Sequence, residues 1–397
     1  MTIYAALAAR YVVSVDGALY LASAKAFLEE EMPFQYHWIR EPLFPIFLRA
    51  IHVLFGNSDL VFTIAQSILL VVAVRLLLNR AIQGKDVVKD LTVVFIVGNS
   101  IAIGYIGAVL QQIWMLSGLC LIAWYAIGFA QRRKIDNTLI RESILVGVVC
   151  GLVSVFLLLP LGITMAAMGI ALLLQDIKQS KVRGKRIGTY FISCSLPVIF
   201  SLIFLGAWFG FKAVELRQNP EPSFNAWIWD YEATYLQVGQ TRAMAIKPLL
   251  NIGFDLPSPW VSENNIYGMG LPNERCGGGI SQNPEFAYSY TGDYFESTCR
   301  PSWAYKLAHN SHGISDRFLT IALTLGLLCT LTLGFLISRT AFLISLPGST
   351  LIFFYWYSGA GISRYGFPVF ATATISVIVA GVVSWNKLTE RKSSIAN

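Results

Sequence analysis

The stretch from Ile144 to Leu174, ILVGVVCGLVSVFLLLPLGITMAAMGIALLL, contains no charged residue, and Pro160 divides it. About 20 consecutive apolar residues in a helix cross a lipid bilayer, and a proline breaks the hydrogen-bond ladder of a helix interior. We therefore predict two short membrane spans that meet at a turn near Pro160. Because the apolar residues are continuous rather than alternating, the stretch indicates helices and not the strands of a membrane barrel.

The whole chain has the composition of a membrane protein. Of its 397 residues, 55% are hydrophobic and 13% are charged, whereas roughly a quarter of the residues in soluble domains are charged. This composition excludes a soluble globular enzyme, and the high apolar content excludes a disordered chain. The predicted fold class is an all-α polytopic membrane protein with about ten transmembrane helices. After a first helix within residues 1–14, the spans are expected at 60–79, 91–109, 112–130, 143–159, 161–175, 189–211, 317–338, 341–357 and 367–385.

The placement of basic residues predicts the orientation of these spans. The net charge is +7, and the basic residues collect in alternate connections. Four groups share this pattern: Arg80, Lys85 and Lys89; Arg132, Arg133, Lys134 and Arg141; Lys178, Lys181, Arg183, Lys185 and Arg186; and Lys387, Arg391 and Lys392. The positive-inside rule places all of them in the cytoplasm, with the protein in the plasma (inner) membrane. The basic excess is thus a topology signal and not a nucleic-acid site.

Three regions follow from this topology. Residues 1–211 form an N-terminal transmembrane module whose first outer loop, 15–59, carries interfacial helices lying on the membrane. Residues 212–316, rich in Pro, Gly, Asn and aromatic residues, form a small extracytoplasmic subdomain, and residues 317–397 form C-terminal helices and a cytoplasmic tail. Cys276 and Cys299 lie in the outer loop, where an oxidising compartment favours a disulfide between them.

Two candidate sites lie in the first outer loop. Asp16, followed by Tyr20, opens an amphipathic segment, so that its carboxylate is a candidate general base or metal ligand; the alternative is a plain helix N-cap. Arg40 and Glu41 precede the proline-rich stretch PLFP. They can supply a cation for a phosphate and a carboxylate for a metal or a sugar hydroxyl, or they form a solvated ion pair at an interfacial turn.

Polar residues later in the chain suggest two further sites. Arg364, next to Tyr365, is a basic residue in an outer connection, against the positive-inside trend. Its guanidinium suits a lipid phosphate, and the alternative is a snorkelling arginine beside an aromatic anchor. His309 and His312 have the spacing of a metal pair, although we favour a surface loop because no further ligand is evident. The spans lack acidic residues, which argues against an ion-coupled carrier.

The order of these motifs resembles the GT-C class of membrane glycosyltransferases, specifically the dolichyl-phosphate-mannose protein mannosyltransferase-like family and its bacterial relatives. The matching segments are Val15–Ala22, with an Asp followed by Tyr and an Ala-rich helix; Arg40–Leu48 with the Leu-Phe-Gly at 54–56; and Arg364-Tyr365 with Pro368. The resemblance covers the first 80 residues and the last 35, and the long loop matches the family only in position.

The resemblance implies an integral-membrane glycosyltransferase that moves a sugar from a polyprenyl-phosphate donor to an extracytoplasmic acceptor (a glycan, lipid or protein), with inversion. Asp16 would deprotonate the acceptor hydroxyl, while Arg364 and Arg40 stabilise the leaving phosphate and Glu41 orients the head group or holds a divalent metal. The donor phosphate and sugar are expected to contact Arg40, Glu41, Arg364, Tyr365 and Tyr20. The sugar, the acceptor and the metal stay open.

Three other interpretations remain. A polysaccharide polymerase or ligase would place key residues such as Arg242 in the outer loop. A non-enzymatic transporter of lipid-linked sugars would carry charged residues along its spans. An inactive relative is the third, because many relatives carry an acidic residue near the turn where this chain has Gln111 and Gln112.

Overall fold

The described part of the chain is helical throughout its regular elements. The computed structural model describes residues 1–8, 20, 24, 42–55, 59–98, 100–107, 111–132, 136–154, 157–178, 185–218, 331–332, 334–358 and 362–396. Its helices are α1 (Thr2–Ala8), α3 (Leu43–Phe55), α4 (Asp59–Ala81), α5 (Asp86–Gly98), α6 (Ser100–Gly107), α7 (Gln112–Arg132), α8 (Asn137–Val153), α9 (Leu158–Lys178), α10 (Lys185–Gln218), α16 (Arg339–Ser358) and α17 (Ile362–Ala396). No strand occurs in these ranges, which confirms the predicted all-α class for them.

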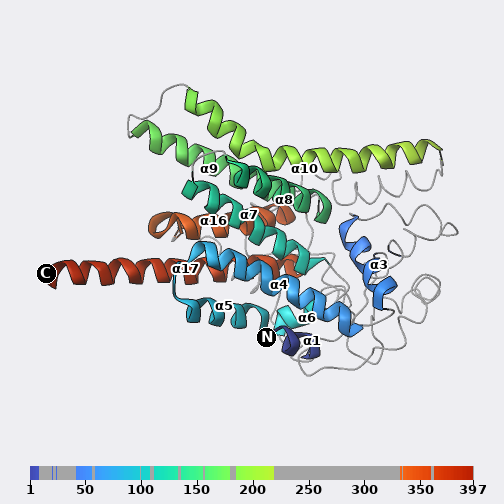
Figure 1. The fold of residues 1–397 in the computed structure, drawn as a ribbon, viewed down its shortest axis with the longest axis horizontal. Helices are drawn as coiled ribbons and strands as arrows, with labels where there is room; N and C mark the ends of the chain where they lie inside the picture. Colours follow the sequence, from blue (N-terminus) through green and yellow to red (C-terminus); the bar gives the residue numbers. More distant parts are fainter. Residues whose placement is uncertain are drawn as a thin grey trace.

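The helices form one bundle around α7. In Figure 1 the long helices lie side by side with similar directions, whereas α3 is turned across them at one end of the bundle, opposite the end from which the C-terminus projects. Most side chains of α7 are buried, and α4, α8, α9, α16 and α17 all pack against it. We call the two ends of the bundle the α3 end and the far end.

Four of the described helical segments are long and apolar enough to cross a membrane. They are Leu60–Ala81, Gln112–Arg132, Phe191–Trp208 and Phe367–Thr389, with mean hydropathies between 1.8 and 2.3. They support a helical membrane protein in a lipid bilayer. The larger count of about ten spans is not established by these four and stays a prediction.

The boundary between the paired central spans differs from the prediction. α8 ends at Val153, Ser154 has an extended backbone, and α9 begins at Leu158. Pro160 therefore lies inside the first turn of α9 and not at the break. The first turn tolerates proline because its N–H groups have no partner within the helix. Two helices occur where the pair of spans is predicted, and the predicted break is wrong by a few residues. That α8 and α9 cross the membrane stays a prediction. The predicted span 91–109 likewise consists of two short helices, α5 and α6.

Glycines let α8 and α10 pack closely together. Ser201 Oγ on α10 donates a hydrogen bond of 2.7 Å to the carbonyl of Gly147 on α8. A Cβ atom would come within 2.7 Å of the Pro197 carbonyl at Gly147 and within 2.9 Å of the Ser201 carbonyl at Gly151. This small-xxx-small spacing allows two backbones to approach without lipid between them.

Charged residues connect α4 to α5 across their tight turn. Gly84 and Lys85 both have positive φ angles, of 63° and 59°. The turn brings Asp86 within 3.9 Å of Arg75 in α4, and Arg75 also pairs with Asp90. The hydrogen bond and positive charge of Lys89 lower the pKa of Asp86. Arg75, which interrupts an otherwise apolar span, is thus neutralised by the neighbouring helix.

Candidate functional site

Aromatic side chains join four segments of the chain at the α3 end. Tyr20 is fully buried, and its ring meets that of Phe44 edge to face, with centroids 4.9 Å apart. Phe44 and Phe47 lie 6.1 and 5.0 Å from the ring of Trp114, and Phe47 lies 6.2 Å from Phe62. This aromatic cluster (Tyr20, Phe44, Phe47, Phe62 and Trp114) attaches the first predicted motif to α3 and to the first turns of α4 and α7.

The amphipathic pattern of α3 explains its position. Phe44, Leu48 and Ile51 recur every three or four residues and are buried against the bundle, while Val53 and Phe55 are exposed. Such spacing gives a helix one apolar face toward its neighbours. The sequence therefore predicted this helix correctly. Its location at a membrane surface stays a prediction.

Contacts at both ends show that α4 and α7 run in the same direction. At the far end, Arg80 donates a hydrogen bond of 3.1 Å to the Trp124 carbonyl, and Gln131 donates one of 3.5 Å to the Arg80 carbonyl. At the α3 end, Phe62 and Trp114 belong to the same aromatic cluster. Residues that lie the same number of turns before the far-end contacts, one in α4 and one in α7, are therefore at the same level along the bundle.

This register places a buried glutamine opposite the first turn of α7. Arg80 of α4 and Gly128 of α7 are neighbours. Gln66 lies about four helical turns before Arg80, and Trp114 lies about four turns before Gly128. The face of α4 that carries Gln66 is otherwise apolar until it reaches Arg80. Its members, spaced by three or four residues, are Phe62, Gln66, Leu70, Ala73, Leu77 and Arg80.

Several amide atoms at this end are buried without hydrogen-bond partners among the described residues. Gln66 and Gln112 are 0% exposed and Gln111 is 8% exposed. Within the described residues, both amide atoms of Gln66, both of Gln112 and Oε1 of Gln111 have no partner, nor does Nε1 of Trp114. Burying an unsatisfied polar group costs about 1–3 kcal/mol, so each such group requires an explanation. We call Gln66, Gln111 and Gln112 the amide group.

The beginning of α17 reaches the same end of the bundle. The ring of Phe367 stacks on that of Tyr105 in α6, with centroids 5.4 Å apart and planes 21° apart. α6 ends at Gly107, shortly before α7 begins, and α17 packs along α7. Arg364 and Tyr365 lie in the first turn of α17, less than one turn before Phe367. The backbone of the predicted C-terminal motif is therefore close to the described end of α6.

Several predicted site residues lie outside the described part of the chain. These are Asp16, Arg40, Glu41, Cys276, Cys299, His309 and His312, and the roles given to them stay predictions. Tyr20 is described, and it lies inside the aromatic cluster. Its predicted contact with the donor also stays a prediction. Among the described residues there is no group of three or more His, Cys, Asp or Glu side chains that could hold a metal.

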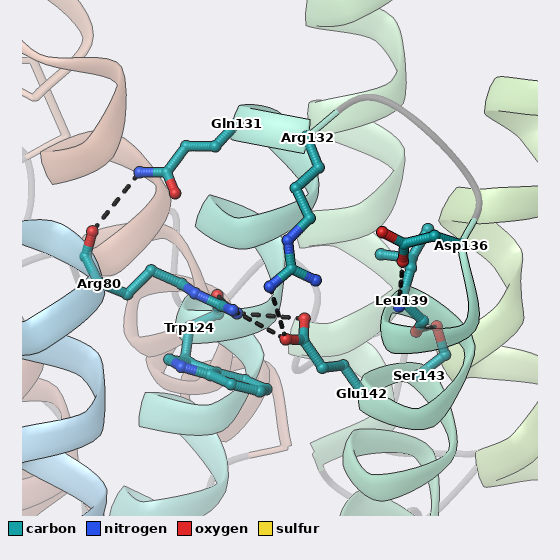
Figure 2. Close-up of polar contacts among 8 residues, drawn as sticks. All are labelled: Arg80, Trp124, Gln131, Arg132, Asp136, Leu139, Glu142 and Ser143. Carbon is teal, nitrogen blue, oxygen red and sulfur yellow. Dashed lines mark hydrogen bonds and ion pairs between the residues drawn. The ribbon is translucent and has the colours of Figure 1, made fainter.

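A second polar cluster lies at the far end, and its carboxylate is paired with two arginines. Figure 2 shows Arg80 and Arg132 converging on Glu142, with Trp124 beneath Arg80. The guanidinium of Arg80 bonds both carboxylate oxygens, at 2.8 and 3.2 Å, and Arg132 bonds one at 3.1 Å. The Arg80 guanidinium also lies 4.0 Å from the Trp124 ring centroid, and a Cβ atom at Gly128 would collide with it. This ion cluster holds α4, α7 and α8 together.

Sequence reasoning missed Gln66 and the role of Glu142. A lone amide within the apolar run FTIAQSILLVV was the available signal for Gln66, since its spacing places it on the buried face of α4. Gln111 and Gln112 were noticed only as uncharged residues. Arg80 and Arg132 were interpreted as topology signals, whereas the structure shows that they also bind Glu142.

The fold and the site define the chain as an α-helical membrane protein with a buried polar group at one end of its bundle. No protein-family model, curated protein or solved structure matches it.

Proposed function

We propose that the chain is an integral-membrane glycosyltransferase that moves a sugar from a polyprenyl-phosphate donor to an extracytoplasmic acceptor, with inversion at the anomeric carbon. In this proposal about ten helices span the plasma membrane and the α3 end faces outward. The observation that supports it is the meeting of distant segments at the α3 end. Tyr20 packs on Phe44, and α17 begins beside Tyr105.

Chain connectivity keeps the proposed catalytic groups near this meeting point. Asp16 is four residues from Tyr20, so its Cα atom lies within about 14 Å of that of the buried tyrosine. Arg364 precedes Phe367 by three residues in a helix, a rise of about 4.5 Å. These short separations support the proposal that Asp16 and Arg364 approach the same donor molecule from segments far apart in the sequence.

The proposed reaction is a single in-line displacement. Asp16 accepts the proton of the acceptor hydroxyl as its oxygen attacks the anomeric carbon. The bond from that carbon to the phosphate oxygen breaks, its electron pair stays on the polyprenyl phosphate, and Arg364 and Arg40 stabilise the added charge. Glu41 orients the sugar or holds a divalent metal, and Tyr365 contacts the donor.

The amide group suits the sugar of such a donor. Each glutamine amide has two N–H donors and a carbonyl acceptor, and sugar hydroxyls both donate and accept hydrogen bonds. Gln66, Gln111 and Gln112 carry no charge, so they favour a neutral hexose over a charged one. Trp114 adds an indole N–H and an apolar ring face. A bound sugar would supply the hydrogen bonds that these atoms lack within the described chain.

The test is sugar release from a panel of labelled polyprenyl-phosphate sugars by the purified protein in lipid nanodiscs. We expect Asp16→Asn to abolish transfer while the amount of folded protein is unchanged, and Arg364→Ala to weaken donor binding. Arg242→Ala, which would inactivate a polymerase or ligase using the outer loop, should retain activity. Full transfer by Asp16→Asn would contradict the catalytic role, and unchanged donor affinity in Arg364→Ala would contradict the phosphate role.

A further inference from the structure

An apolar cavity of about 420 Å³ lies between α9 and α10. Its lining includes Gly162, Ala166 and Gly169 from α9 and Phe191, Cys194 and Val198 from α10. Ser195 also lines it, but its hydroxyl already bonds the carbonyl of Phe191 at 2.9 Å in the same helix. The described lining is therefore mainly hydrocarbon, and the hydroxyl proton of Ser195 is already used within α10.

Small residues on one face of α9 create this cavity. Gly162, Ala166 and Gly169 recur at intervals of four and three residues, so they face the same direction. A Cβ atom added at Gly162 would meet nothing within 4 Å, while one at Gly169 would lie 3.2 Å from Cys194 Sγ. The space is thus open near Gly162 and narrows beside Cys194.

The surroundings of the cavity are those of a lipid-facing surface. Phe191 is 75% exposed and Leu174 is 60% exposed, and Ile170 and Ile192 are also exposed. α9 and α10 lie together at one edge of the bundle in Figure 1. In a bilayer, hydrocarbon chains contact such a surface.

The length of the cavity and the charges beyond it select one kind of occupant. From Gly162 to Leu173 the lining covers about 16 Å of helix, about half of a 30 Å hydrocarbon core and so one leaflet. α9 then ends at Lys178, and α10 begins at Lys185 and Arg186, about 8 Å of helix from the last lining residues. The sequence therefore supplies basic residues at the ends of both helices, and basic residues near a membrane surface favour an anionic head group.

We propose that the α9–α10 cavity binds one acyl chain of an anionic phospholipid whose phosphate lies at the basic ends of α9 and α10. The phospholipid belongs to the leaflet at the far end of the bundle. Its binding is independent of the proposed glycosyl transfer.

Paired glycine variants test the apolar part of the site. Gly162→Leu fills the cavity, and Gly206→Leu adds the same side chain at an exposed position of α10 where a Cβ atom also meets nothing within 4 Å. Native mass spectrometry of the full-length protein counts bound phosphatidylglycerol and phosphatidylcholine with identical chains. We expect one phosphatidylglycerol to be retained by the parent and by Gly206→Leu, and its affinity to fall at least tenfold in Gly162→Leu.

A charge variant tests the head-group part. Lys185→Gln combined with Arg186→Gln should weaken phosphatidylglycerol about 30-fold, as expected for two cations near an anionic head group, and leave phosphatidylcholine unchanged. Equal retention of the two lipids by the parent protein would overturn the proposal without any variant. Unchanged binding in Gly162→Leu, or displacement of the lipid by polyprenyl phosphate but not by added phosphatidylglycerol, would overturn it as well.

Discussion

Replacing Gln66 with leucine should stabilise the protein and weaken its binding of the sugar. Leucine has nearly the same volume, so the change opens no cavity between Phe62 and Leu70 on the same face of α4. It removes two buried amide atoms that lack partners among the described residues. Each unsatisfied group costs about 1–3 kcal/mol. Counting only one of them, we expect the free energy of unfolding to rise by about 1–3 kcal/mol.

The effect on binding has the opposite sign. One or two hydrogen bonds from the amide of Gln66 to a neutral sugar contribute about 0.5–1.5 kcal/mol each. Their loss should reduce donor affinity by about 2-fold to 150-fold. Affinity for polyprenyl phosphate without a sugar should not change, because the amide group is proposed to contact only the sugar.

Two measurements check this prediction. Unfolding in mixed micelles gives the stability change, with the exposed Gln83→Leu as a matched control expected to stay within about 0.5 kcal/mol of the parent. Titration with a polyprenyl-phosphate sugar and with the sugar-free lipid gives the binding change. Destabilisation by Gln66→Leu would show that the amide is satisfied in the folded protein. Stabilisation with unchanged sugar affinity would refute the sugar contact alone.

Three further predictions concern the packing that holds the site. Glu142→Ala should destabilise the protein by about 3–5 kcal/mol because it leaves the buried Arg80 guanidinium without its carboxylate partner. Arg132→Ala should cost less than about 1 kcal/mol because that side chain is partly exposed. A denaturant titration that finds equal losses of stability for the two variants would contradict this. Gly151→Leu should cost about 1–3 kcal/mol or more, since its side chain meets the Ser201 carbonyl, and normal thermal stability would argue against the close α8–α10 contact. Tyr20→Phe should preserve sugar transfer. Tyr20→Ala should lose about 3–5 kcal/mol of stability and most of its sugar-transfer activity. Loss of transfer in both variants would instead assign the hydroxyl a direct role.

Much of the fold could be predicted from apolar runs, and the errors have physical causes. The continuous runs that contain α4, α7 and the apolar part of α17 predicted helices where helices occur. Pro160 misled because proline marks either a break or a helix beginning, and the choice depends on where the preceding helix ends.

The polar contacts at the two ends of the bundle could not be predicted from the sequence. The assignment of the first-loop and C-terminal motifs to one outer site stays a prediction, which the ring contacts of Tyr20 with Phe44 and of Phe367 with Tyr105 support. Which buried polar residues have partners depends on neighbouring helices, since Arg80 and Glu142 are far apart in the sequence. The sequence around Arg80 or around Glu142 does not indicate that the two side chains form an ion pair.

The contrast between the two polar clusters indicates where a ligand can bind. Glu142 already accepts three hydrogen bonds from arginines, so a ligand there would have to displace strong charged contacts. Gln66 and Gln112 are as deeply buried but have no hydrogen bonds to lose within the described chain. A ligand that reached these amides would gain hydrogen bonds without breaking any that the described chain provides, and the amides are already removed from water in the folded protein. On this ground the ion cluster is a structural connection and the amide group is the candidate binding site.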